Sequence, residues 1–288
     1  MSGDALRDKA LEGLPVADRR VDAAGITTAV LEGGEGPPLV LLHGPGESGL
    51  HWRRVIPALV GTHRVVAPDL PGHGASGPLP EGAAARTVDW LGDLIEETCD
   101  VPPTVVGSTL GGAVAARLAA HGCDRLRGLV LVDTLGLVAF APDPRFGQAL
   151  NAFLTHPDAG TNDDLWRVCA YDFERMRDAM GEAWETVLAY HLDRIAAPAT
   201  MPALGALMQE FALHAIPPEV LAQIDVPTTL VWGREDLATS LAAAEGTSER
   251  YGWPLHVIEQ CADAPALEQP EALIEALETA DDRLGVTR

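Results

Sequence analysis

A short glycine-rich stretch places two hydroxyl side chains where they could do chemistry. Ser108 and Thr109 lie between the apolar residues Val105 and Val106 and an alanine-rich segment that begins at Leu110. This order predicts a strand, a sharp turn and a helix. A hydroxyl on such a turn becomes a good nucleophile only when a base removes its proton.

A second apolar run also ends in a glycine-rich turn. Residues 41–46 read LLHGPG. Glycine lets the backbone approach a ligand closely, so Gly44 or Gly46 could offer its N–H to a substrate. Pro45 has no N–H to offer. We interpret His43 as a residue of the loop and not as a base.

Three further segments follow apolar runs. Residues 67–76 read APDLPGHGAS, residues 231–236 read VWGRED and residues 261–270 read CADAPALEQP. We interpret Asp69 and His73, in the first of these segments, as side chains that brace a tight loop.

Taken in chain order, the five segments resemble the α/β-hydrolase superfamily, in particular its subgroup of esterases, C–C bond hydrolases, epoxide hydrolases and haloperoxidase-like enzymes. The resemblance covers roughly residues 20–277. It implies a nucleophile position at Thr109, an acid at Asp236 and, where the family carries histidine, Asp263. Ser108, one residue before that nucleophile position, is then expected to point elsewhere. It also implies an oxyanion hole built from the backbone N–H of Leu110 with that of Gly44 or Gly46 (the other donor is left open).

Thr109 and Asp263 depart from the serine and histidine of the family pattern. The β-branch of threonine disfavours the positive φ that such a turn requires. An aspartate with its ordinary pKa near 4 is a weak base at neutral pH. If Asp263 lies close to another carboxylate in a buried site, its pKa rises, and the protonated group could then act as an acid.

These departures leave several hypotheses open. The first is an enzyme that binds a small, largely apolar carbonyl compound and acts by non-covalent acid–base or oxyanion chemistry, as a cyclase, isomerase or lyase would. The alternatives are a hydrolase of esters or related bonds with an atypical base, a binding protein that has lost its chemistry, and a laboratory variant. Four histidines are weaker candidates for the missing base: His156, His191, His214 and His256.

Alternating strand-like and helix-like stretches predict the fold. Buried strands are expected at residues 39–42, 65–67, 104–106, 129–132, 229–232 and 255–258. Helices are expected at residues 88–99, 110–121, 241–251 and 270–280. The runs are continuously apolar, as in parallel strands covered on both faces. Residues 20–32 could add an antiparallel start, so we predict a mostly parallel, doubly wound α/β-hydrolase sheet.

The alternation stops between residues 136 and 218, where bulky side chains concentrate. We predict an inserted helical cap there, flanked by core residues 1–135 and 219–288, with residues 1–19 as an N-terminal extension. A cap at the carboxyl edge of the sheet would cover the ligand site. We expect Trp166, Trp184 and Met208 to line the substrate pocket.

Composition limits the partners. The 288 residues carry 42 acidic and 20 basic side chains, a formal charge of −22. Such a surface repels nucleic acid and anionic lipid, so a small-molecule substrate is expected. No cofactor motif or metal-ligand spacing is present, and a homodimer is compatible with the sequence. Without a signal-peptide pattern or a membrane span, a cytoplasmic protein is expected, with four reduced cysteines: Cys99, Cys123, Cys169 and Cys261.

Overall fold

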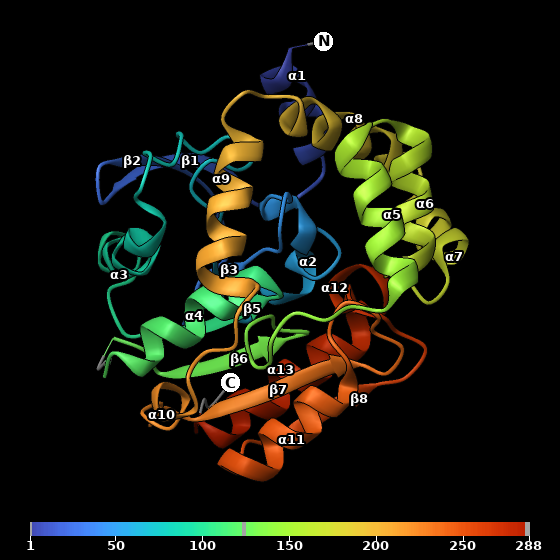
Figure 1. The fold of residues 1–288 in the computed structure, drawn as a ribbon. Helices are drawn as coiled ribbons and strands as arrows, with labels where there is room; N and C mark the ends of the chain where they lie inside the picture. The colour runs from blue at the N-terminus through green and yellow to red at the C-terminus, as the bar shows by residue number, and fades with distance from the viewer. Residues whose placement is uncertain (1, 123–124, 286–288) are drawn as a thin grey trace.

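An eight-stranded sheet runs through the centre of the computed structural model, which describes residues 2–122 and 125–285 (Figure 1). The strand order is β1-β2-β4-β3-β5-β6-β7-β8. The strands are β1 (Ala17–Ala23), β2 (Ile26–Gly33), β3 (Pro38–Leu42), β4 (Arg64–Pro68), β5 (Thr104–Ser108), β6 (Gly128–Val132), β7 (Thr228–Gly233) and β8 (Leu255–Ile258). All six predicted strands are present, although in β8 only Ile258 is buried.

The sheet is antiparallel only at its N-terminal edge. Strand β2 pairs antiparallel with β1 and with β4, and β3 to β8 are joined by parallel pairs. This confirms the mostly parallel α/β-hydrolase sheet and the antiparallel start expected from residues 20–32.

Thirteen helices lie within the described residues. They are α1 (Gly3–Leu11), α2 (Ile56–Leu59), α3 (Thr87–Thr98), α4 (Leu110–Ala120), α5 (Pro144–Thr155), α6 (Ala159–Cys169), α7 (Phe173–Met180), α8 (Ala183–Ile195), α9 (Thr200–Leu207), α10 (Pro218–Leu221), α11 (Leu241–Tyr251), α12 (Pro265–Glu268) and α13 (Pro270–Arg283). Short turns η1 (Gly49–Trp52), η2 (Ala84–Arg86) and η3 (Met208–Ala212, a π-helix) join some of them. The four predicted helices correspond to α3, α4, α11 and α13. Helix α1 was not predicted.

Helices cover both faces of the sheet because side chains alternate along each strand. Val40 and Leu42 pack into the cluster that holds α3, α4 and part of α11. Leu39 and Leu41 pack into the opposite cluster, with α2 and α13. Since each fully buried leucine or valine contributes about 1.5–3 kcal/mol, both faces must stay covered.

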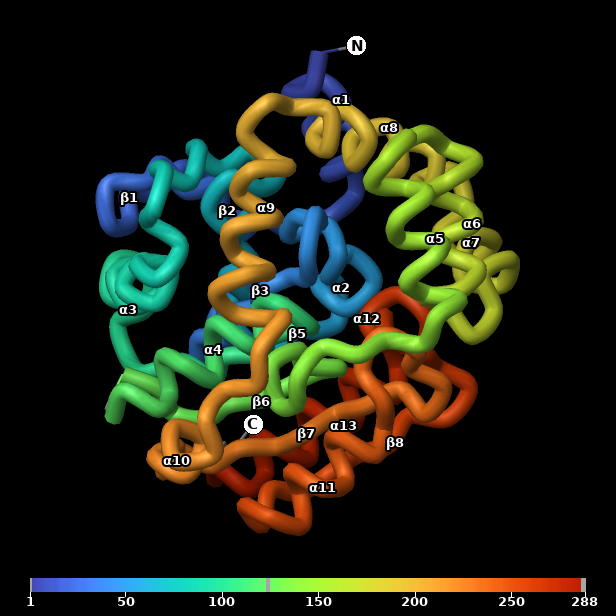
Figure 2. Tube along the Cα trace, in the orientation of Figure 1, coloured from blue at the N-terminus to red at the C-terminus, as the bar shows by residue number. Residues whose placement is uncertain are grey.

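Between β6 and β7 the chain forms helices only. We call residues 144–207 the α5–α9 segment. The tube view shows α5, α6 and α7 gathered on one side of the molecule and α9 running across its middle (Figure 2). Helix α8 packs against α1, so the N-terminal helix and this segment meet. The division into core and cap at residues 136 and 218 stays a prediction.

Candidate active site

The strand ends bring distant parts of the chain to one edge of the sheet. Leu42 lies opposite Gly107, Ser108 opposite Val132, and Val132 opposite Val231. Because parallel strands share their direction, the segments that follow β3, β5, β6 and β7 leave the sheet together. Ligands of open α/β sheets bind at this carboxyl edge.

Thr109 occupies the corner between β5 and α4. Its backbone has φ 44° and ψ −106°, outside the region that a β-branched residue prefers. Three hydrogen bonds hold this conformation: its N–H donates to Val132 O at 2.9 Å, and its carbonyl accepts from Leu135 N and from Ala113 N, each at 3.2 Å. A backbone of this kind costs about 1–3 kcal/mol and persists where the surroundings impose it, often at functional sites.

The glycines around the corner let the strand and helix approach each other. A Cβ on Gly107 would lie 2.5 Å from the backbone of Gly112, and a Cβ on Gly111 would lie 2.6 Å from Leu42 O. Neither contact could be relieved by turning a flexible side chain, because the atoms belong to the backbone. The G-S-T-L-G-G spacing is therefore a packing requirement of the corner.

The Thr109 hydroxyl is buried and has no hydrogen-bond partner. It lies beside Gly44, since a Cβ placed on that glycine would meet Thr109 Oγ1 at 2.5 Å. The same point lies 2.8 Å from Glu47 Oε2. Ser108, in contrast, lies within β5, and its buried hydroxyl also lacks a partner.

Of the amides predicted for the oxyanion hole, that of Gly44 is already engaged. It donates to Glu47 Oε2 at 2.9 Å, while Glu47 Oε1 contacts His51 Nδ1 at 3.0 Å. Burial tends to raise the pKa of Glu47, but His51, His43 and the Gly44 N–H outweigh it and lower the pKa to about 2. The Leu110 amide begins α4, where helical N–H groups have no partner within the helix.

Asp236 follows β7, as predicted, and is buried. Its Oδ1 accepts from the N–H groups of Ala238 and Thr239 at 2.7 and 3.0 Å, and its Oδ2 accepts from the Thr239 hydroxyl. Burial, and to a smaller extent Glu268, raise its pKa to about 6 against these hydrogen bonds. Asp236 is therefore a stronger base than an ordinary aspartate.

Asp263 follows β8 in the loop before α12. Its N–H donates to Cys169 O at 3.1 Å, and the Cys169 thiol hydrogen-bonds its carboxyl group. Burial, followed by the charges of Asp236, Glu268 and Glu47, raises the pKa of Asp263 well above its ordinary value. The condition set by the sequence, that this group be close to other carboxylates, is met. A protonated carboxyl can donate a proton but cannot accept one as a free base.

Asp133 is a further buried carboxyl that the sequence analysis did not single out. It follows β6, has φ 42°, and accepts from Gly233 N at 2.8 Å through Oδ1, while Oδ2 has no partner. Burial and then Asp236 raise its pKa well above the usual value. The available signal was its position directly after the buried run LVLV. Glu47 was missed as well, although it directly follows HGPG.

The first two motif histidines are structural. His43 is fully buried between Leu70 N, which donates to Nε2 at 2.9 Å, and Gly44 O, which lies 2.8 Å from Nδ1. His73 lies against it, and burial and His43 lower its pKa to about 4. Asp69 accepts from Gly49 N and Ala75 N, so it braces the loops after β3 and β4.

The four alternative histidines differ in position. His191, on α8, lies within electrostatic reach of Glu47 and stacks on Phe153. His156 and His214 are exposed to solvent, which argues against a place in the pocket. His256, on β8, is influenced by Arg283 at the end of α13.

The three predicted lining residues fall into two groups. Trp166 and Trp184 form an edge-to-face pair with ring centroids 6.0 Å apart, in a cluster with Ala264 and Leu267, which follow Asp263 in the chain. Met208 packs instead into the large cluster around α4. The structure thus brings the two tryptophans near Asp263 and Met208 to the cluster that includes Leu110, and their place in a substrate pocket stays a prediction.

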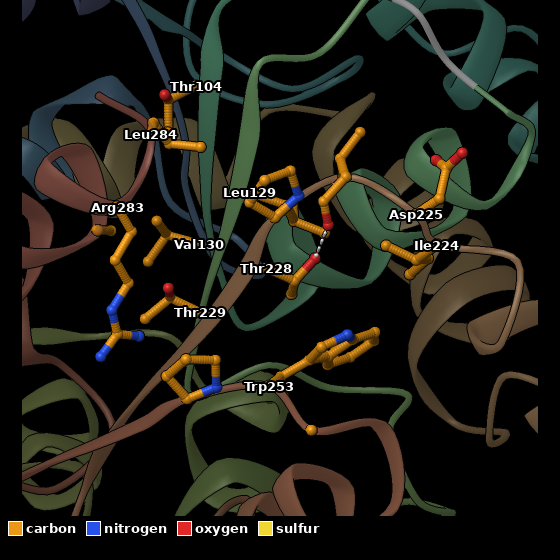
Figure 3. Close-up of a pocket in the computed structure, with 15 residues that line it drawn as sticks. Thr104, Leu129, Val130, Ile224, Asp225, Thr228, Thr229, Trp253, Arg283 and Leu284 are labelled. Atoms are coloured by element: carbon orange, nitrogen blue, oxygen red, sulfur yellow. Dashed lines mark hydrogen bonds between the residues drawn. The ribbon is translucent and has the colours of Figure 1, made fainter. Parts of the chain in front are cut away.

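A cavity of about 310 Å³ lies at the other end of the strands. Residues at the start of β5, β6 and β7, such as Thr104, Leu129 and Thr228, line it together with Trp253 and Arg283 (Figure 3). None of the predicted site residues contributes to its wall. It is therefore separate from the carboxyl edge that holds Thr109.

Residues 2–122 and 125–285 contain no group of three or more metal-ligating side chains, and no helix within them is long and apolar enough to cross a membrane. Cys99, Cys169 and Cys261 are free thiols. Cys123 lies outside the described residues.

Residues 39–276 match the model of the alpha/beta hydrolase family. The chain belongs to this family. Named relatives of similar sequence are also enzymes. One is 2-hydroxy-6-oxo-6-(2'-aminophenyl)hexa-2,4-dienoic acid hydrolase of Metapseudomonas resinovorans, 28% identical over 94% of this chain and 93% of the relative. Another is pimeloyl-[acyl-carrier protein] methyl ester esterase of Aeromonas hydrophila, 30% identical over 85% of this chain and 95% of the relative.

A solved structure agrees in fold. The 2-hydroxy-6-oxo-6-phenylhexa-2,4-dienoate hydrolase from Rhodococcus sp. strain RHA1 superposes on this member of the alpha/beta hydrolase family with a TM-score of 0.80 at 23% identity. The match covers 93% of this chain and 99% of the other. The relatives are hydrolases, so they favour the hydrolase alternative over the cyclase, isomerase or lyase expected first.

Proposed function

We propose that this α/β-hydrolase-fold enzyme hydrolyses carboxylic esters or related acyl bonds, with carboxyl groups in place of the usual imidazole. The observation that carries the proposal is the strained corner at Thr109, which presents a buried, unpartnered hydroxyl at the carboxyl edge. Named relatives that cleave an ester or a dienoic acid support the reaction class.

Thr109 is the proposed nucleophile or the group that positions the attacking water. Asp236, with a pKa of about 6, is ionised at neutral pH and is the proposed proton acceptor. Asp263, whose pKa is raised by burial and by Asp236, is the proposed proton donor to the leaving group. Catalysis by two carboxyl groups with separated pKa values needs no histidine.

The substrate we propose is a small, largely apolar carbonyl compound held beneath the α5–α9 segment as a cap. The amide of Leu110, with that of Gly44 or Gly46, would polarise its carbonyl oxygen. Trp166 and Trp184 would line the site on the side of Asp263, because their cluster includes its neighbours.

Turnover of a p-nitrophenyl acyl ester panel tests this proposal. Thr109→Ala is expected to reduce kcat/KM by about 100-fold or more, whereas Ser108→Ala removes a buried hydroxyl one residue away and leaves it unchanged. Asp263→His supplies a base with a pKa near neutrality and is expected to raise turnover by about 100-fold. Full activity in Thr109→Ala, or no turnover in any variant, would contradict the proposal.

A further inference from the structure

We propose that Glu47 occupies the oxyanion site of the resting protein, so that a substrate carbonyl binds there only after the glutamate carboxylate leaves the Gly44 amide. This makes Glu47 a residue that determines which compounds enter and how fast they react. The inference rests on the proposed function, because it takes the edge around Thr109 to be the reacting site.

The position of the carboxylate carries the proposal. Glu47 Oε2 accepts the Gly44 N–H at 2.9 Å. An oxyanion-hole donor lies 2.7–3.1 Å from the oxygen that it stabilises, so the carboxylate oxygen has the separation expected of a bound oxyanion. A Cβ atom placed on Gly44 would lie 2.8 Å from Glu47 Oε2 and 2.5 Å from Thr109 Oγ1. The carboxylate and the hydroxyl therefore flank the same glycine.

The carboxylate is held in place from its other side. Its Oε1 contacts His51 Nδ1 at 3.0 Å, and the His51 side chain is only 3% exposed. A charge-assisted hydrogen bond in such a shielded place is stronger than one in water. The Glu47 side chain itself is 23% exposed, so it is not sealed in the interior and can move.

The Thr109 hydroxyl offers the Glu47 carboxylate a second hydrogen-bond donor. The hydroxyl of Thr109 is buried without a partner, so it can donate to the carboxylate once the Gly44 amide is released. While Glu47 stays on that amide, its negative charge opposes a second negative oxygen at the same place. We therefore expect the native protein to bind carboxylates and developing oxyanions poorly.

Acetate is the probe, because it offers the same two oxygens as the glutamate and its binding needs no hydrolysis. Acetate titration, followed by the shift of the Gly44 amide in a ¹⁵N–¹H NMR spectrum, is expected to show at least about ten-fold tighter binding to Glu47→Ala than to the native protein. Glu47→Gln, which keeps the shape and loses the charge, is expected to lie between them. The exposed Glu245, changed to Gln, is the matched control and is expected to behave as the native protein.

The opposite result would show that Glu47 only braces its loop. A folded Glu47→Ala that binds acetate no tighter than the native protein overturns the proposal. If Glu47→Ala fails to fold, Glu47→Gln decides, and unchanged acetate affinity in that variant overturns the proposal as well. Tighter acetate binding with no ester turnover in any variant would refute the proposed function and, with it, the effect of Glu47 on reaction rate, and would leave only the occupation of the Gly44 amide by Glu47.

Discussion

Two buried groups of charges in this protein are balanced in different ways. Arg7, from α1, lies 2.7 Å from Asp18 and 2.7 Å from Asp69 and also donates to the hydroxyl of Tyr190 on α8. At the carboxyl edge, Asp133, Asp236, Asp263 and Glu268 form no ion pair with lysine or arginine within the part of the chain that the structure describes. Their hydrogen-bond donors are backbone amides, a hydroxyl and thiols.

The difference shows what each group does. In the first group the arginine satisfies the carboxylates and joins α1, β1, the loop after β4 and α8. In the second, burial raises the pKa of every member, and neighbouring carboxylates raise the pKa values of Asp133, Asp236 and Asp263 further. Uncompensated acids in a fold cost stability, and clusters of perturbed groups are typical of functional sites. The first group stabilises the architecture, whereas the second is the group to which the proposed function assigns proton transfer.

The largest effect is expected from breaking the balanced group. Arg7→Ala leaves Asp69 buried without its cation, and we expect the free energy of unfolding to fall by roughly 3–5 kcal/mol. Chemical denaturation at pH 7 measures it. A loss below about 1 kcal/mol would show that Arg7 is not the element that balances these acids.

The unbalanced group should respond in the opposite direction. The pKa of Asp236 is raised to about 6 in the fold, above its ordinary value, so its ionisation destabilises the native state. The protonated Asp236 carboxyl makes its full contribution to the free energy of unfolding below about pH 4, and this contribution is lost as the pH rises through 6. Asp236→Asn is therefore expected to raise the free energy of unfolding at pH 8, by on the order of 2 kcal/mol, and to have little effect at pH 4.

Denaturation curves at both pH values check this expectation. Asp263→Asn is expected to change stability in the same direction, since its carboxyl is perturbed by the same causes. If Asp236→Asn changes the free energy of unfolding equally at pH 4 and pH 8, ionisation of Asp236 does not destabilise the native state.

The smallest effect is expected at the surface. Arg234 and Glu259 form a two-pronged ion pair in which both side chains are about half exposed or more. Water and salt screen such a pair, so Arg234→Ala is expected to leave Tm unchanged within error. A drop comparable to that of Arg7→Ala would remove the distinction between buried and exposed pairing on which the comparison depends.

The sequence by itself determined the sheet, the corner and the family. Apolar runs ended by glycine or proline are local signals, and they located β3 to β8 within one or two residues. The G-S-T-L-G-G spacing located the corner because close packing of strand and helix leaves no room for other side chains there. Helix α1 was not predicted because the side chain that holds it in place, Arg7, hydrogen-bonds to residues that lie 11, 62 and 183 positions further along the chain.

Only the tertiary structure decided which acids share the site and in which protonation state. Asp133, Asp236 and Asp263 lie after three different strands, and their pKa values depend on burial and on one another. Neither the burial of these carboxyl groups nor their influence on one another can be inferred from the local spacing of residues in the sequence. The same holds for Glu47, whose carboxylate lies on the Gly44 amide beside Thr109 because β3 and β5 are neighbours in the sheet, although 61 residues separate them in sequence.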